Sequence, residues 1–299
     1  MKLLAKFNLI FCLVFGAGLA VAAWLAYAFL EQNAKREVIQ QARLMMESTL
    51  ATRNYTSTQV KPLLLPIEER ERKFLSQTVP AFAATKAFQF IHQTYADYAY
   101  KEATLNPSNP ADRADDWEAD IVHYFRNKPS EAELIGERDT PTGRSLFLAR
   151  PITIKDKGCL DCHDTAARAP IAVVRQYGPN NGFGWHMNET IGAQIVSVPE
   201  SVAIGMAGKA LKTLLAYLAI LAVITLLVLD SVLVATVIKP VARLSGMADE
   251  ISKGRMDVQE LPVKGKDEIS VLAKSFNRMQ RSLLRAMKML EDEGNETRE

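Results

Sequence analysis

Two long apolar runs constrain this chain more than any other feature. The first extends from Phe7 to Leu30 and the second from Leu214 to Ile238. At about 1.5 Å per helical residue, each run is long enough to cross the roughly 30 Å hydrocarbon core of a bilayer. The runs therefore predict two membrane-spanning helices, with one large segment between them and a shorter segment after the second.

The first run could instead belong to a cleaved signal peptide. Ala20-Val21-Ala22 fits a small-x-small cleavage site. A signal peptide usually has a shorter apolar region, however, and this run continues without a turn residue into a segment that favours helix. We therefore expect residues 1–30 to form an uncleaved membrane anchor.

The basic residues beside the runs predict the orientation of the chain. Lys2 and Lys6 precede the first run, and Lys239 and Arg243 follow the second. Lysine and arginine gather on the cytoplasmic side of spanning helices, so both ends of the chain are expected in the cytoplasm. The prediction is a two-span protein of the cytoplasmic (inner) membrane, with the segment between the spans in the periplasm.

Two residues within the runs need an explanation. Asp230 lies in the second run, and a carboxylate at the centre of a spanning helix costs about 2.5–3.5 kcal/mol on insertion scales. Because Asp230 lies nearer the cytoplasmic end, we expect an interhelical hydrogen bond or a hydrated helix end, with a functional relay as the alternative. Cys12, in the first run, is expected to pack there, with palmitoylation as the alternative.

The run Cys159-Leu160-Asp161-Cys162-His163 carries the clearest chemical signal. Two thiols separated by two residues can form thioether bonds with the two vinyl groups of a porphyrin, and the histidine that follows can ligate the iron. We therefore predict one covalently attached haem c, with Cys159 and Cys162 as tethers and His163 as an axial iron ligand. A disulfide is the alternative, because a zinc site would need two further ligands at suitable spacing.

Further residues are expected around this haem. On the side of the iron opposite His163, Met46 or Met45 is the preferred ligand, and a vacant or water-bound position is the alternative. The remaining candidates for that position are His92, His123, His186 and Met187. Arginines could pair with the haem propionates, because a guanidinium fork suits a carboxylate, although at least two of the three are expected to be ordinary surface residues. These candidates are Arg53, Arg144 and Arg150.

The segment between the runs predicts an α+β domain. Residues 31–61 are rich in helix formers and continue the first span as a long helix that Pro62 closes. Further helices are expected over 80–102 and 115–127. A hairpin-type connection is expected at 178–182, between the last two strands. The predicted strands are Ser145–Ile154, Ile171–Tyr177 and Ile191–Val198.

This domain resembles a known family, the PAS-like haem-c sensor domains found ahead of signalling modules in bacterial membrane proteins. The resemblance extends over roughly residues 35–200. It implies a PAS-like antiparallel sheet that cradles the haem, with Cys159, Cys162 and His163 in the family's roles. Members vary in the ligand opposite the histidine. The matching segments are 53–56, 100–107, 148–152, 159–163, 181–185 and 191–196.

Residues 239–290 contain two amphipathic helices around a connector. Apolar residues recur at spacings of three and four in both, which favours packing against partner helices. With Pro240 at the membrane exit, Asp267-Glu268-Ile269 at the start of the second helix and Phe276-Asn277-Arg278-Met279 inside it, the segment resembles a HAMP domain. The resemblance implies a homodimer, because HAMP is a parallel dimeric four-helix relay. Ser270 stands where the family often has glycine, and a generic dimerising coiled coil is the alternative.

The order of these segments predicts a receptor. A periplasmic haem domain at 31–211 is followed by the second span at 212–238, the HAMP domain at 239–290 and a disordered tail at 291–299. We predict that the haem senses redox state or a diatomic gas such as O2, NO or CO, and that a separate cytoplasmic signalling protein reads the output. The alternative is a membrane-anchored monohaem cytochrome that exchanges electrons with a donor, for example as an accessory subunit of a respiratory or photosynthetic complex.

Composition and motifs argue against other classes. Lysine and arginine total 36 against 34 acidic residues, so the charge balance gives no electrostatic reason to expect nucleic acid. All four histidines lie between residues 92 and 186, and the sequence has no phosphate-cradling glycine loop. We therefore do not expect an independent enzymatic activity.

Overall fold

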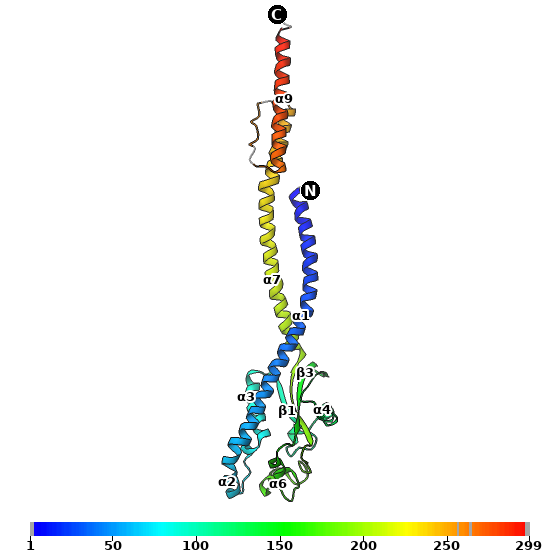
Figure 1. Cartoon of the computed structure of the whole chain (residues 1–299), viewed down its shortest axis with the longest axis vertical. Helices are drawn as coiled ribbons and strands as arrows, with labels where there is room; N and C mark the ends of the chain where they lie inside the picture. The colour runs from blue at the N-terminus through cyan, green and yellow to red at the C-terminus, as the bar shows by residue number, and fades with distance from the viewer. Residues whose placement is uncertain (1–2, 256, 263–264, 297–299) are drawn as a thin grey trace. The chain divides into compact units, whose positions relative to one another are not determined.

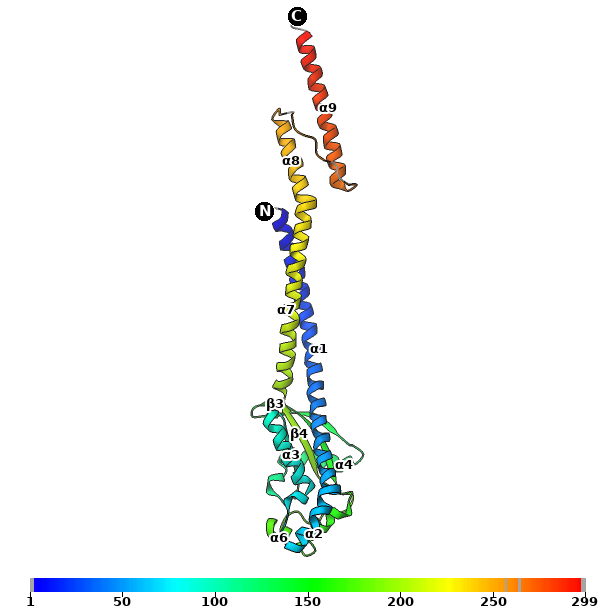
Figure 2. The ribbon, with the colours of Figure 1, turned by 90° about the vertical axis from the view of Figure 1, so that its left-hand side faces the viewer.

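The computed structural model describes residues 3–255, 257–262 and 265–296. It divides into two compact units. One unit comprises residues 25–212, and the other comprises residues 1–24 together with 213–299. Figures 1 and 2 show the order of the helices and strands along the chain.

The N-terminal helix α1 is continuous from Leu3 to Tyr55 (Figure 1). A π-helical segment, η1 at Thr56–Val60, then leads into α2 at Lys61–Glu71. The prediction that Pro62 closes the helix was therefore wrong. Pro62 lies in the first turn of α2, where its missing N–H is tolerated, and the π segment absorbs the change of hydrogen-bond register.

A four-stranded antiparallel sheet of order β1-β4-β3-β2 forms the centre of the unit at 25–212. The predicted strands at 145–154 and 191–198 correspond to β3 and β4. Strand β4 is central, since its Val196 lies between Tyr100 on β1 and Leu148 on β3. The strands are β1 at Ala99–Thr104, β2 at Leu134–Thr140, β3 at Gly143–Thr153 and β4 at Thr190–Pro199.

Both edge strands lie where the sequence predicted something else. The helix expected over 80–102 is α3 at Pro80–Thr94, which ends before β1 begins. Strand β2 lies in a stretch for which no strand was predicted, and it pairs with β3 through a tight hairpin at Gly143, whose φ is +114°. Both edge strands carry charged residues whose ion-pair partners lie on other elements. The alternation of apolar and polar residues that identifies a strand in the sequence is therefore weak in both.

The strand predicted at Ile171–Tyr177 is a helix, α6. Its β-branched residues favour strand intrinsically, but of its apolar side chains only Val173 is buried, which suits a short surface helix with one inward face. Gly178, at φ +81°, ends the helix. Residues 178–182 therefore do not form a hairpin connection, because the element directly before them is helix α6.

Helices cover both faces of the sheet. On one face, α1 places Val38, Ala42 and Met46 at helical spacing against a core that includes Leu148 and Val196. On the other face, α4 at Asp116–Asn127 packs its apolar side chains against the alternate residues of the same strands. The residues of this second core are Ala103, Ile121, Val122, Phe125, Phe147, Ala149, Ala193 and Ile195.

The second unit is helical and takes in helix α7 from residue 213 onward. Helix α7 (Glu200–Leu233) continues through a π segment, η5 at Val234–Ile238, into α8 at Lys239–Ser252, and α9 spans Glu268–Glu296. Side chains of α9 hold the connector after α8. Asn277 bonds both the amide and the carbonyl of Leu261 at 3.1 and 2.9 Å.

Two helical stretches, Leu3–Glu71 and Glu200–Ser252, are long and apolar enough to cross a membrane. Within the unit that contains residues 1–24 and 213–299, the two stretches make a polar contact. The Asn8 side-chain amide donates a hydrogen bond to Asp230 Oδ2 at 3.0 Å. Of the two explanations expected for Asp230, an interhelical hydrogen bond or a hydrated helix end, the structure contains the first.

Candidate functional site

The Cys-x-x-Cys-His segment forms a short helical turn. The 3-10 turn η4 at Lys157–Cys159 leads directly into α5 at Leu160–His163. Asp156 starts the turn, because its carboxylate accepts a hydrogen bond from the Gly158 amide at 2.8 Å. Cys159 and Cys162 are therefore one helical turn apart and lie on neighbouring parts of one face. Both thiols are partly buried and free.

Burial sets the charge state of these side chains. It raises the pKa of the Cys159 thiol, an effect that Asp156 reinforces and that the nearby charges of Arg53 and Lys61 oppose. Burial likewise raises the pKa of the Cys162 thiol. It lowers the pKa of His163, which keeps the imidazole neutral at neutral pH. A neutral imidazole is the form that ligates a metal.

The His163 ring is held on two sides. Its Nδ1 lies 2.7 Å from the carbonyl oxygen of Gly182. Since a carbonyl only accepts, Nδ1 carries the proton and Nε2 presents its lone pair, as in most histidines that ligate metals. The ring also stacks on Trp185, with centroids 3.8 Å apart and an angle of 13° between the planes.

The loop that holds His163 depends on glycine. Gly182 has φ +81°, and a Cβ there would lie 1.9 Å from Ser108 Oγ. Asn106 fixes the loop from the other side, because its side chain accepts from the Gly182 amide and donates to the Phe183 carbonyl, both at 3.1 Å. Asn106 therefore joins the segment 100–107 to the segment 181–185, at the loop that holds His163.

Sequence reasoning did not assign roles to Asn106, Gly182 or Trp185. The glycine-rich segment 181–185 was identified only as one of the segments that carry the family resemblance, without a role for its single residues. Its partner His163 lies 19 residues before Gly182, so no local periodicity connects the two.

Arg53 is the predicted propionate partner whose charge reaches the Cys159 thiol. It extends from α1 and pairs with Glu102 on β1. Glu102 is buried and also accepts a hydrogen bond from the Tyr100 hydroxyl at 2.8 Å. A buried polar cluster therefore joins α1 to the sheet beside the Cys-x-x-Cys-His turn.

The other two candidate arginines have different surroundings. Arg144 lies beside the β2–β3 hairpin, where it pairs with Glu137 and Asp139, each at 3.4 Å. Arg150, on β3, bridges Glu47 at 2.6 Å and Glu133 at 3.0 Å. Among the described residues, their ion-pair partners lie on α1, on β2 and just before β2. None of these partners belongs to the Cys159–His163 segment.

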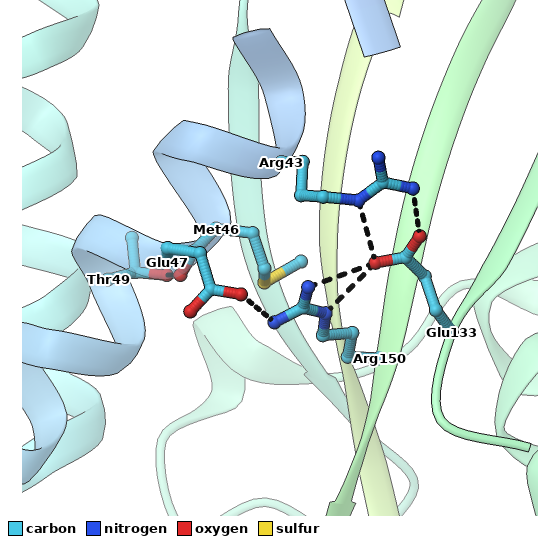
Figure 3. A network of polar contacts seen from close by, with 6 residues as sticks. All are labelled: Arg43, Met46, Glu47, Thr49, Glu133 and Arg150. Carbon is cyan, nitrogen blue, oxygen red and sulfur yellow. Dashed lines mark hydrogen bonds and ion pairs between the residues drawn. The ribbon is translucent and has the colours of Figure 1, made fainter. Parts of the chain in front are cut away.

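Figure 3 shows the network around Arg150. Arg43 and Arg150 converge on the Glu133 carboxylate, which Arg43 reaches at 2.5 Å. This pairing, with the Arg43 hydrogen bond as the largest cause, lowers the pKa of Glu133. The network therefore ties α1 to β3 and to the chain just before β2.

The candidate methionines lie in the core. Met46 extends from α1 toward the strands (Figure 3) and is fully buried against the apolar side chains of the sheet. Met45 is partly buried against the same core. Both therefore have a packing role, and their use as iron ligands stays a prediction. Of the other candidates, His92 has its Nδ1 2.7 Å from the Tyr98 carbonyl.

Along the chain, an α+β domain lies between two apolar helical stretches, and a helical module follows the second. With the two family matches that follow, this order indicates a sensor-type protein. Residues 31–199 match the family model Tll0287-like, described as Tll0287, and residues 232–285 match the HAMP domain. Because the first match covers more than half of the chain, the chain belongs to the Tll0287-like family. The apolar helices and the HAMP domain indicate a membrane-anchored protein.

The chain is similar to a solved structure described as the crystal structure of the cyanobacterial heme-protein Tll0287. The two are 14% identical, with a TM-score of 0.42, and the similarity covers 55% of this chain and 95% of the other. A search of curated proteins gave no match.

Proposed function

We propose that this chain is a membrane-anchored sensor that holds one haem c covalently, through thioether bonds from Cys159 and Cys162. His163 is its axial iron ligand. The observation that carries the proposal is the fixed imidazole, whose Nδ1–H bonds Gly182 and whose Nε2 is left for a metal. The solved namesake of the family is described as a heme-protein, which agrees with this assignment.

A bound haem c supplies an iron that changes oxidation state or takes up a diatomic gas such as O2, NO or CO. The chain's own residues hold and orient it. Trp185 fixes the plane of the His163 ring by stacking, and Asn106 fixes the loop that carries Trp185. Arg53 is the proposed propionate partner, since its position beside Cys159 is already set by Glu102. We retain Met46 or Met45 as the proposed ligand opposite His163.

The sheet provides a route for the signal. The loop with Trp185 leads into β4, the strand that pairs with both β1 and β3. Strand β4 ends at Pro199 and α7 begins at Glu200, with no linker between them. A shift of the loop is therefore passed to α7 through a hydrogen-bonded strand. We also propose that this sheet is the PAS-like scaffold that the family resemblance implies.

The helical module is the proposed relay. HAMP domains commonly function in dimeric signalling proteins. Leu272, Met279 and Leu283 on α9 are exposed apolar residues at spacings of seven and four, as in a seam that packs on partner helices. We propose a homodimer with both chain ends in the cytoplasm and the haem domain in the periplasm, read by a separate cytoplasmic signalling protein. The HAMP match favours this function over electron transfer, which needs no relay.

Hydrogen–deuterium exchange of the full chain in lipid nanodiscs tests the relay. We expect peptides of α8 and α9 to exchange at different rates in the oxidised and the reduced protein, because two packings of a bundle differ in backbone protection. The Cys159→Ala/Cys162→Ala double variant, which cannot tether haem, should show no such difference. Identical exchange in both redox states of the haem-loaded protein would instead support an electron carrier.

A further inference from the structure

The face of α1 that points away from the sheet carries exposed apolar residues. Leu44 is 72% exposed and Tyr55 is 61% exposed, whereas Met46 on the opposite face is fully buried. At 3.6 residues per turn, Leu44, Ser48, Ala51 and Tyr55 fall within a sector of about 60°. They form one line along the helix, which we call the outer line of α1.

The spacing of the outer line is that of a coiled-coil seam. Its members follow one another at intervals of four, three and four residues. This is the alternation of core positions in a heptad repeat. Two large residues flank the small Ser48 and Ala51, so a second helix can approach closely in the middle.

The charges beside the outer line do not oppose such an approach. Arg43 and Glu47 are the nearest ionisable neighbours of Leu44 and Ser48, and each is paired within its own chain. Arg43 bonds Glu133 and Glu47 bonds Arg150 (Figure 3). The outer line is uncharged from Leu44 to Tyr55, so burial of these residues leaves no charge without a partner. One heptad before Leu44, the same sector carries the exposed Glu37, which accepts a hydrogen bond from Gln41 at 3.3 Å, so the proposed contact begins at Leu44.

We propose that the outer line of α1 is an interface with the same line of a second copy of this chain. The occupant follows from two observations. HAMP domains commonly function in dimers. In addition, α1 is continuous from Leu3 to Tyr55, so two copies inserted in one membrane present this helix in the same direction. Parallel α1 helices then match residue for residue, Leu44 against Leu44 and Tyr55 against Tyr55. The inference rests on the homodimer within the proposed function.

Cysteine crosslinking of the full chain in native membranes tests this interface. Single cysteines replace Ser48 or Ala51 in a Cys12→Ala background, with Asn54→Cys as a control on the side of the same helix and Gln89→Cys as an exposed control on α3. Side chains held at an interface meet at a far higher effective concentration than by collision. We therefore expect about tenfold more covalent dimer at Ser48 and Ala51 than at either control.

Two further variants make the outcome decisive. Leu44→Glu/Tyr55→Glu, which changes only exposed side chains, should suppress the Ala51→Cys crosslink while the haem spectrum stays unchanged. Leu283→Cys reports separately on the HAMP dimer. Crosslinking at Leu283 without any at Ser48 and Ala51 would overturn the interface and leave the dimer intact. No crosslinking at any of the three would overturn the dimer itself, and equal crosslinking at all α1 and α3 positions would overturn the interface.

Discussion

His163 donates its ring Nδ1–H to the carbonyl oxygen of Gly182 across 2.7 Å. The acceptor belongs to a loop that Asn106 clamps and that leads into β4. The orientation of the proposed iron ligand therefore depends on a backbone segment that is continuous with the central strand. This relationship puts the proposed haem ligand and the start of the proposed signalling route in the same loop.

Replacing Gly182 should damage the site through a steric clash. Gly182→Ala places a Cβ against Ser108 at a positive φ, whereas Gly184→Ala has a similar φ of +80° but no atom within 4 Å of the new Cβ. We expect Gly182→Ala to lower the free energy of unfolding by about 1–3 kcal/mol more than Gly184→Ala does. Both variants strain a backbone with positive φ, but only the Cβ at residue 182 also has to displace Ser108. Urea unfolding of both variants measures this. Equal losses would show that Gly182 is needed only for its backbone angle.

Arg53 should affect the reduction potential of the haem more than Arg150 does. A cation near the haem disfavours the more positive oxidised state, so Arg53→Ala should lower the potential. Arg150→Ala also removes one positive charge, but that charge pairs with Glu47 and Glu133, away from the Cys159–His163 segment. This variant should therefore leave the reduction potential nearly unchanged. Spectroelectrochemical titration of both proteins measures the difference. Equal shifts in both variants would contradict the role given to Arg53.

The proposed role of Met45 or Met46 as an iron ligand can be tested without creating a cavity in the core. Truncation of a buried methionine to alanine typically costs about 2–5 kcal/mol, so loss of folding would confuse the result. Met46→Leu and Met45→Leu keep the volume and remove the sulfur. One of them should change the optical spectrum of the haem if that sulfur ligates iron. Unchanged spectra in both would remove the methionines as candidates.

Asp112 should make stability depend on pH. Burial, reinforced by the charge of Glu102, raises the pKa of Asp112 from 3.8 to about 6. The folded state then holds this proton more tightly than the unfolded state, so stability decreases as pH rises from about 4 through 6. Asp112→Asn should remove that decrease. Because Asp112 is partly exposed, we expect an effect smaller than the full shift.

Urea midpoints at pH 5 and pH 7.5 measure the Asp112 effect. The wild type should lose stability relative to Asp112→Asn between these two values. Midpoints that move in parallel would show that another group causes any pH dependence.

Sequence patterning predicted the parts of the fold that depend on local periodicity. The long α1 helix, α4 and the inner strands β3 and β4 follow apolar spacing. Strand β1 does not, since it carries Lys101 and Glu102, whose partners Glu118 and Arg53 lie on other elements. The short apolar run at Ile171–Tyr177 was ambiguous by periodicity, and its tertiary surroundings made it a helix.

The site was predictable where its chemistry is contiguous. Cys159, Cys162 and His163 lie close together in the sequence, so their spacing alone predicts their proposed role. The residues that orient His163 are separated from it in sequence and could be identified only from the folded structure. For the same reason, spacing could not distinguish Arg53 from Arg144 and Arg150.

The most direct test of the central claim is a denaturing gel of the full chain, stained for haem after expression with a c-type maturation system. Covalent thioethers survive denaturation, whereas a ligand bond alone does not. We predict haem staining on the wild type and on Cys12→Ala, and none on Cys159→Ala/Cys162→Ala. A wild type without haem stain, or a double variant that keeps it, would contradict covalent attachment through Cys159 and Cys162.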